Sequence, residues 1–169
     1  DPSCAPVIYM TTDLPDHQMP SLYTACDALV HPYRGEGFGL PVAEAMASGL
    51  PVIVTRGGST DDFCPDDLVF SVPAERCPVQ LQELTAGQAW LLEPNTEALR
   101  VQMRYAFEHP EEARRRGQLG SDHIRTHFTW DRSARIALDQ LEGVVQRHER
   151  AASTTVLSEA ERDNSGVNA

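Results

Sequence analysis

A loop that carries two glycines between two glutamates constrains this chain more than any other stretch. The glutamates, Glu36 and Glu44, are eight positions apart. The seven residues between them begin with Gly-Phe-Gly-Leu-Pro at positions 37–41. An apolar helix is predicted directly after the loop, with its end at Gly49. Glycines let a backbone approach a ligand closely, and a helix N-terminus offers free N–H groups and a partial positive charge to an anion. The stretch therefore predicts an anion-binding loop at the start of a helix.

The two glutamates indicate that the ligand also carries hydroxyl groups. Carboxylates do not bind phosphates, but they accept hydrogen bonds from hydroxyls such as those of a sugar or a ribose. An anion-binding loop flanked by two such acceptors favours a site for a nucleotide sugar. The plainer alternative is that Glu36 and Glu44 are solvated acids, stabilised by the helix dipole.

Short apolar runs alternate with helical patterns along the first part of the chain. Strands are predicted at residues 7–10, 28–30 and 52–55, and helices at 17–26 and 41–48. A second glycine turn, Gly57-Gly58, precedes another helix start at Asp61. This alternation is the signature of a parallel sheet with right-handed crossovers. We therefore expect an α/β, Rossmann-like domain, a parallel sheet with helices on both faces.

The second half of the chain gives weaker signals. Residues 70–88 contain two prolines and a glycine without a long periodicity, and we interpret them as a loop with short local structure. A further apolar run follows at residues 90–92, Asn95 is a predicted helix N-cap, and Pro110 opens another helix.

The C-terminal part divides into a helix and a polar segment. Apolar positions at helical spacing predict a last helix over residues 131–148. Residues 151–169 have few apolar side chains, and we expect a disordered tail there. The expected organisation is thus one domain over residues 1–150, followed by the tail.

Composition excludes several classes of function. The 169 residues carry a net charge of −11, which argues against nucleic acid as a partner. No apolar run approaches the roughly 20 residues of a membrane span. The four cysteines are irregularly spaced and form no metal-ligand pair, so we expect reduced thiols, a cytoplasmic protein and no metal.

Residues 36–52 resemble a long motif of one enzyme family. They match E-G-F-G-L-P-x-x-E-A-M-A-x-G-x-P-V, the E-x7-E motif of the retaining family 4 glycosyltransferases, which have the GT-B fold. The family's later G-G-x-x-E is similar to residues 57–61, with Asp61 in place of glutamate. The resemblance extends over about residues 8–145. It implies a C-terminal, donor-binding domain, a partial half of the GT-B fold that is incomplete at its N-terminal side.

The resemblance also implies roles for the loop. Glu36 would lie at the donor sugar as the catalytic residue, and Glu44 would bind the ribose hydroxyls. The other donor-binding residues would be Gly37, Phe38, Gly39 and Leu40, through backbone amides. The substrate would be a UDP- or GDP-linked sugar, without any cofactor, and the leaving phosphate would help to take the acceptor's proton.

The family also grips the diphosphate with an arginine and a lysine from an earlier loop. This chain has no lysine, and that loop would precede residue 1. Arg34 and Arg56 are the candidate phosphate contacts here, although each is equally well explained as an ordinary loop arginine. The implied enzyme is a hexosyl-type transferase with an unknown acceptor. Its N-terminal acceptor domain is missing here, so we expect this chain alone to be inactive. The alternative is a non-catalytic nucleotide-sugar-binding or interaction module derived from such an enzyme.

Overall fold

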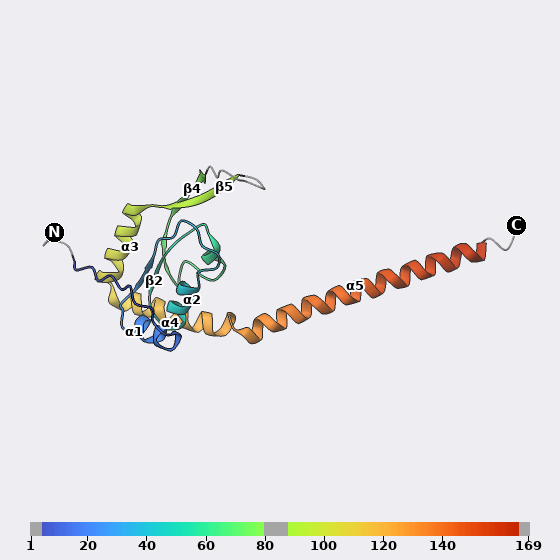
Figure 1. Cartoon of the computed structure of the whole chain (residues 1–169), viewed down its shortest axis with the longest axis horizontal. Helices are drawn as coiled ribbons and strands as arrows, with labels where there is room; N and C mark the ends of the chain where they lie inside the picture. The colour runs from blue at the N-terminus through green and yellow to red at the C-terminus, as the bar shows by residue number, and fades with distance from the viewer. Residues whose placement is uncertain (1–4, 80–87, 166–169) are drawn as a thin grey trace. The chain divides into compact units, whose positions relative to one another are not determined.

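The structure is a computed structural model that describes residues 5–79 and 88–165, with side chains as far as His148. The chain divides into two units, residues 1–125 and residues 126–169. Figure 1 shows the order of helices and strands along the chain. Among the helices in these described ranges, none has both the length and the apolar character that a membrane span requires.

A three-stranded parallel sheet forms the centre of the first unit. Its strands are β1 (Leu29–His31), β2 (Val52–Thr55) and β3 (Phe70–Val72), in the order β1-β2-β3. All four residues of β2 are buried, as expected for a central strand with both faces covered. The predicted parallel pairing of residues 28–31 with 52–55 is confirmed, with Val30 opposite Ile53.

Helices cover both faces of this sheet, as predicted. On one face, Val52 and Val54 pack with Val42 and Met46 of α2 (Leu40–Ala47). The short helix α1 (Met19–Thr24), which follows a 3-10 turn at Asp16–Gln18, lies beside α2. On the other face, Ile53 packs in a separate cluster with Phe70 and with Ala106 of α3 (Thr96–Glu108). The alternation of side chains along β2 thus supplies both cores.

Two helix boundaries in this unit follow their sequence signals. The side chain of Asn95 accepts a hydrogen bond from Ala98 N at 2.8 Å, so the predicted N-cap of α3 is confirmed. Helix α4 (Pro110–His127) begins at the predicted proline. Gly117 of α4 lies so close to the backbone carbonyl of Gly49 that a β-carbon would overlap it, so this helix can approach the α2–β2 turn only with glycine here.

The prediction of a loop over residues 70–88 is wrong for the described part of that stretch. Residues 70–72 are β3, and β4 (Ala74–Val79) pairs antiparallel with β5 (Ala89–Pro94) as a second, two-stranded sheet. The pattern was missed because Pro78 interrupts β4 and most of its residues are at least partly exposed, so no apolar periodicity marks the strand. Residues 80–87 lie outside the described part.

The strand predicted at residues 7–10 is also wrong. These residues have no strand conformation, and Val7, Ile8 and Tyr9 are 91%, 86% and 87% exposed. An apolar run forms a strand only when another strand supplies its hydrogen bonds, and within the described residues β1 pairs with β2 alone. Local sequence could not reveal the missing partner.

The second unit contains helix α5, Trp130–Ser165. It includes the helix predicted over residues 131–148 and continues beyond it into the segment for which we expected disorder. The sequence has neither proline nor glycine from Val144 to Ser165, so nothing in it ends the helix where the apolar positions stop. Low apolar content predicts the absence of a core, which is a different property from the absence of a helix.

Candidate functional site

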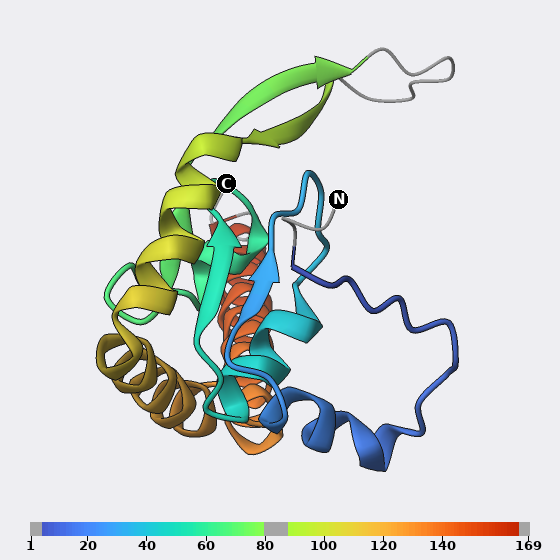
Figure 2. The same ribbon diagram turned by 90° about the vertical axis from the view of Figure 1, so that its left-hand side faces the viewer.

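Two glycine-containing loops meet at one edge of the parallel sheet. The loop with Glu36 follows β1, and the turn with Gly57 follows β2. Because β1 and β2 are parallel neighbours, both loops emerge at the carboxyl edge, where open α/β sheets bind ligands. Figure 2 shows the arrowheads of β1 and β2 pointing toward this same edge. The Ser59 hydroxyl, which donates to the Glu36 carbonyl at 3.2 Å, joins the two loops.

Gly39 sets the start of α2. Its φ of 95° lies in the left-handed region, and it is the N-cap residue of the helix. A β-carbon at Gly39 would lie 2.6 Å from the Thr60 Cγ2 atom. Because glycine has no side chain, it cannot cap the first amides of α2. The N-terminus of α2 therefore lies at the carboxyl edge without a side-chain cap. A free helix N-terminus is the feature that the sequence predicts for anion binding.

The carboxylate of Glu36 is held on two sides. Its Oε1 atom accepts a hydrogen bond from Gly37 N at 2.9 Å, and its Oε2 atom lies 3.3 Å from His31 Nε2. The contact with His31, followed by the hydrogen bond from Gly37 N, lowers the pKa of Glu36 from its ordinary value. The Glu36 side chain remains 26% exposed. It is therefore an oriented, ionised hydroxyl acceptor that a ligand can reach.

The carboxylate of Glu44 is held by a different partner. The buried Tyr23 of α1 donates its hydroxyl to Glu44 Oε2 at 2.8 Å. Burial, together with this carboxylate, raises the pKa of Tyr23 to about 12, so the phenol stays a hydrogen-bond donor. Tyr23 and Glu44 line a cavity of about 400 Å³. Its remaining lining residues are Asp16, Met19, Pro20, Ala47, Ser48 and Arg125.

The remaining loop residues combine exposed apolar side chains with backbone close to the helix start. Phe38 stacks on the buried Phe63, with ring centroids 4.9 Å apart, and remains 46% exposed. Leu40, the first residue of α2, is 61% exposed. Gly37 has open space where a β-carbon would be. These residues thus form an accessible surface around the helix start.

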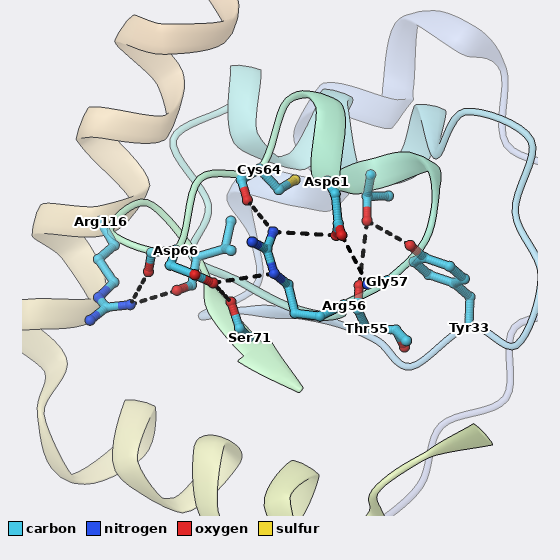
Figure 3. Close-up of polar contacts among 11 residues, drawn as sticks. Tyr33, Thr55, Arg56, Gly57, Asp61, Cys64, Asp66, Ser71 and Arg116 are labelled. Atoms are coloured by element: carbon cyan, nitrogen blue, oxygen red, sulfur yellow. Dashed lines mark hydrogen bonds and ion pairs between the residues drawn. The ribbon is translucent and has the colours of Figure 1, made fainter. Parts of the chain in front are cut away.

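Both candidate phosphate-binding arginines are engaged by carboxylates. Arg34 Nε lies 3.0 Å from Glu93 Oε2 of β5. Arg56 lies 3.3 Å from Asp61 and 3.2 Å from Asp66, and it donates to the Cys64 carbonyl at 2.8 Å. Figure 3 shows the Arg56 guanidinium between these three groups. A phosphate would have to compete with acids for either arginine, and the phosphate-contact role stays a prediction.

The network around Arg56 also shapes the second glycine turn. Asp61, which replaces the family's glutamate, accepts a hydrogen bond from Gly57 N at 2.9 Å. The Tyr33 hydroxyl, which lies beside this turn in Figure 3, is 2.8 Å from Thr60 Oγ1. A β-carbon at Gly58 would lie 2.5 Å from the same hydroxyl. Tyr33 is buried. The ring of Tyr33 thus supports the turn.

Sequence reasoning missed the two side chains that orient the glutamates. His31 ends β1, where the sequence allows a histidine that faces the cleft but favours a rim or core position, and Tyr23 fits an apolar helical stripe. Both lie outside the motif of residues 36–52, and neither carries a local signal of its contact. Within residues 5–79 and 88–148, no group of three or more acidic, histidine or cysteine side chains could hold a metal ion.

Comparison with known proteins decides the family. The sequence profile of the family described as glycosyl transferases group 1 matches residues 5–121. The chain belongs to this family. The family match and the fold together support a C-terminal GT-B glycosyltransferase domain, as the motif predicted.

Individual relatives agree with this assignment. The MMP alpha-(1->4)-mannosyltransferase of Mycolicibacterium hassiacum is 27% identical over 142 residues, 83% of this chain and 30% of the relative. The mannosylfructose-phosphate synthase of Agrobacterium fabrum is 29% identical over 130 residues, 76% of this chain and 24% of the relative.

A solved structure is also similar. Sucrose-phosphate synthase from Thermosynechococcus elongatus has a TM-score of 0.50 and 26% identity, covering 78% of this chain and 27% of that protein. This group 1 chain therefore spans less than a third of the length of these relatives.

Proposed function

We propose that this chain is the donor-binding part of a retaining glycosyltransferase that uses a UDP- or GDP-linked sugar. The observation that carries the proposal is the pair of oriented carboxylates, Glu36 and Glu44, on either side of an uncapped helix start. Membership of the glycosyl transferases group 1 family supports the same chemistry.

The proposed roles follow from what each group can bind. Glu36, ionised and exposed, would accept hydrogen bonds from the donor sugar's hydroxyls. Glu44 would accept those of the ribose, with Tyr23 fixing one of its oxygens and leaving the other free. The amides at the start of α2 and the partial positive charge there would face the sugar and the diphosphate.

The transfer itself would depend on positioning and charge stabilisation. The bond between the anomeric carbon and the diphosphate oxygen breaks, and the acceptor oxygen bonds to that carbon on the same face. The acceptor's proton passes to the leaving phosphate. The chain would hold the sugar in place and stabilise negative charge on the departing diphosphate. Electrostatic stabilisation of this kind usually contributes most to the rate enhancement of an enzyme. No cofactor is needed.

A rival function has one observation in its favour. Arg34 and Arg56, which lie on the two loops, are both paired with carboxylates. A domain whose nearby cations are neutralised in this way would suit a non-catalytic nucleotide-sugar-binding or interaction module. We favour the enzyme because the oriented, accessible carboxylates of Glu36 and Glu44 occur in a chain that belongs to a family of glycosyl transferases.

Glutamine substitutions in the full-length protein test the proposal. Glu36→Gln and Glu44→Gln each keep the side-chain size but remove the charge, and each should lower sugar transfer on the order of 100-fold. Glu97→Gln is the matched control, because Glu97 is an exposed helical glutamate paired with Arg100. The assay uses a panel of UDP- and GDP-linked sugars. Near-normal turnover by both site variants would reject the enzymatic roles.

A further inference from the structure

The hairpin β4–β5 is fastened to both loops of the candidate site. Leu92 N donates to the Arg34 carbonyl at 2.7 Å, and Arg34 and Glu93 form an ion pair. A β-carbon at Gly35, next to Glu36, would lie 3.2 Å from the Leu91 side chain. One at Gly57 would lie 3.4 Å from the side chain of Leu92. The base of the hairpin is therefore packed against the loops that follow β1 and β2.

One face of the hairpin continues outward from this base. Leu92 is 2% exposed and belongs to the main core. Trp90 precedes it by two residues and so lies on the same face of β5. Arg76 is opposite Leu92 in the register. Figure 2 shows the hairpin extending beyond the carboxyl ends of β1 and β2. The face that begins in the core at Leu92 thus carries Arg76 level with Leu92 and Trp90 one residue pair further toward the hairpin tip on the same face.

Trp90 and Arg76 form a stacked pair on that face. The Arg76 guanidinium carbon lies 4.3 Å from the centre of the Trp90 ring. Trp90 nevertheless remains 46% exposed. The guanidinium fixes the ring on one side while a large aromatic area stays accessible. An indole ring held in this way is available to pack on the face of a ligand.

We infer that the Arg76–Trp90 pair is a sugar subsite, in which the ring of Trp90 stacks on a pyranose of the substrate. This inference rests on the proposed function. The face of a pyranose that carries C–H groups is apolar and flat enough to pack on an indole. The guanidinium beside it offers donors to a hydroxyl or phosphate oxygen. The same chemistry fits the donor's sugar and a sugar acceptor. Of the two loops, the turn with Gly57 contacts Leu92, on the face of β5 that carries Trp90.

Two variants of similar bulk separate stacking from a structural role. Trp90→Phe keeps an aromatic ring, whereas Trp90→Leu keeps an apolar side chain without a ring. The full-length protein is titrated with UDP-glucose, GDP-mannose, methyl α-glucoside and methyl α-mannoside, with saturation-transfer NMR reporting contacts of the sugar-ring protons. UDP and GDP serve as sugar-free ligands. Trp130→Leu is the control, since Trp130 is 91% exposed on α5.

The leucine variant should weaken binding of the sugar-containing ligand about tenfold and the phenylalanine variant much less. UDP and GDP should bind all variants equally. Loss confined to nucleotide sugars assigns the subsite to the donor, and loss confined to methyl glycosides assigns it to the acceptor. Equal binding by the parent and the leucine variant would overturn the inference, as would a parallel loss of UDP or GDP. If the parent binds no nucleotide sugar, the proposed function fails. Binding of the methyl glycosides then tests separately whether a pyranose stacks on Trp90.

Discussion

The hydroxyl of Tyr23 on α1 donates a 2.8 Å hydrogen bond to the carboxylate of Glu44 on α2, twenty-one residues away in the sequence. The buried ring leaves the hydroxyl as its only polar group, and that group is aimed at the proposed ribose acceptor. Under the proposed function, Tyr23 would be a positioning residue that acts on the ribose through Glu44.

Replacing Tyr23 by phenylalanine tests this relationship. The ring still fills its buried place, but Glu44 loses its fixed orientation. We expect KM for the donor to rise several-fold with kcat nearly unchanged, and the free energy of unfolding to fall by about 1 kcal/mol. Steady-state kinetics and urea unfolding measure the two effects. An unchanged donor KM would show that Glu44 needs no such support.

The pKa of Glu36 predicts a pH dependence. The pKa of Glu36 is lower in the folded protein than its ordinary value. The ionised carboxylate therefore stabilises the fold at pH values above the ordinary pKa. This stabilisation is lost as the pH falls through the lowered pKa of the folded protein. A carboxyl-resolved NMR titration should find the Glu36 midpoint below the ordinary value for a glutamate. In a His31→Ala variant the midpoint should move upward, because the contact that lowers this pKa most is removed. An unchanged Glu36 midpoint in the His31→Ala variant would contradict this account.

Gly39 and Gly37 form a matched pair for backbone effects. Gly39→Ala places a β-carbon 2.6 Å from Thr60 Cγ2 and forces alanine into a left-handed conformation. We expect a loss of about 2–4 kcal/mol in the free energy of unfolding. Gly37→Ala meets open space, so denaturant unfolding should show less than about 0.5 kcal/mol of change. Equal losses at the two positions would show that the left-handed turn and its contact with Thr60 do not govern stability.

Two buried threonines should respond oppositely to valine. Within the described part of the chain, the Thr55 hydroxyl is fully buried without a hydrogen-bond partner. Thr55→Val should therefore be neutral or stabilise the fold by up to about 1 kcal/mol. Thr60→Val removes the contact with Tyr33 and should destabilise it by about 1 kcal/mol. Thermal unfolding of both variants compares them, and a clearly destabilised Thr55→Val would reveal an unseen partner.

The chain by itself should be inactive and bind nucleotides weakly. Water would enter an uncovered site and weaken its electrostatic contacts, and the total charge of −11 disfavours a diphosphate. Isothermal titration of residues 1–169 with UDP and GDP should find affinities weaker than micromolar. Micromolar binding or measurable sugar transfer would show that these residues hold a more complete site.

The sequence was sufficient for features whose signals are local. Glu36, Glu44 and the glycine at the start of α2 lie within one motif, and β1, α2 and β2 follow one another with clear start and end residues. Their arrangement is dictated by the few connections that a parallel sheet permits. The family assignment was carried by the same motif and is confirmed.

Features that depend on distant contacts were not predictable. Nothing near Tyr23 indicates that it reaches Glu44, and Arg56 gave no sign that three groups from residues 61–66 would engage it. Within the described residues, β4 and β5 pair only with each other, and proline breaks the alternation of β4. Each of these contacts becomes visible only after the chain has folded.

The self-contained pairing of the hairpin has an evolutionary consequence. All six residue pairs of β4 and β5 lie within the hairpin, and one backbone hydrogen bond, from Leu92 to Arg34, joins it to the β1 loop. Its length and its outer residues can therefore change while the register of β1, β2 and β3 is preserved. An enzyme built in this way can acquire a new substrate preference by exchanging one peripheral segment, with its reaction chemistry left intact.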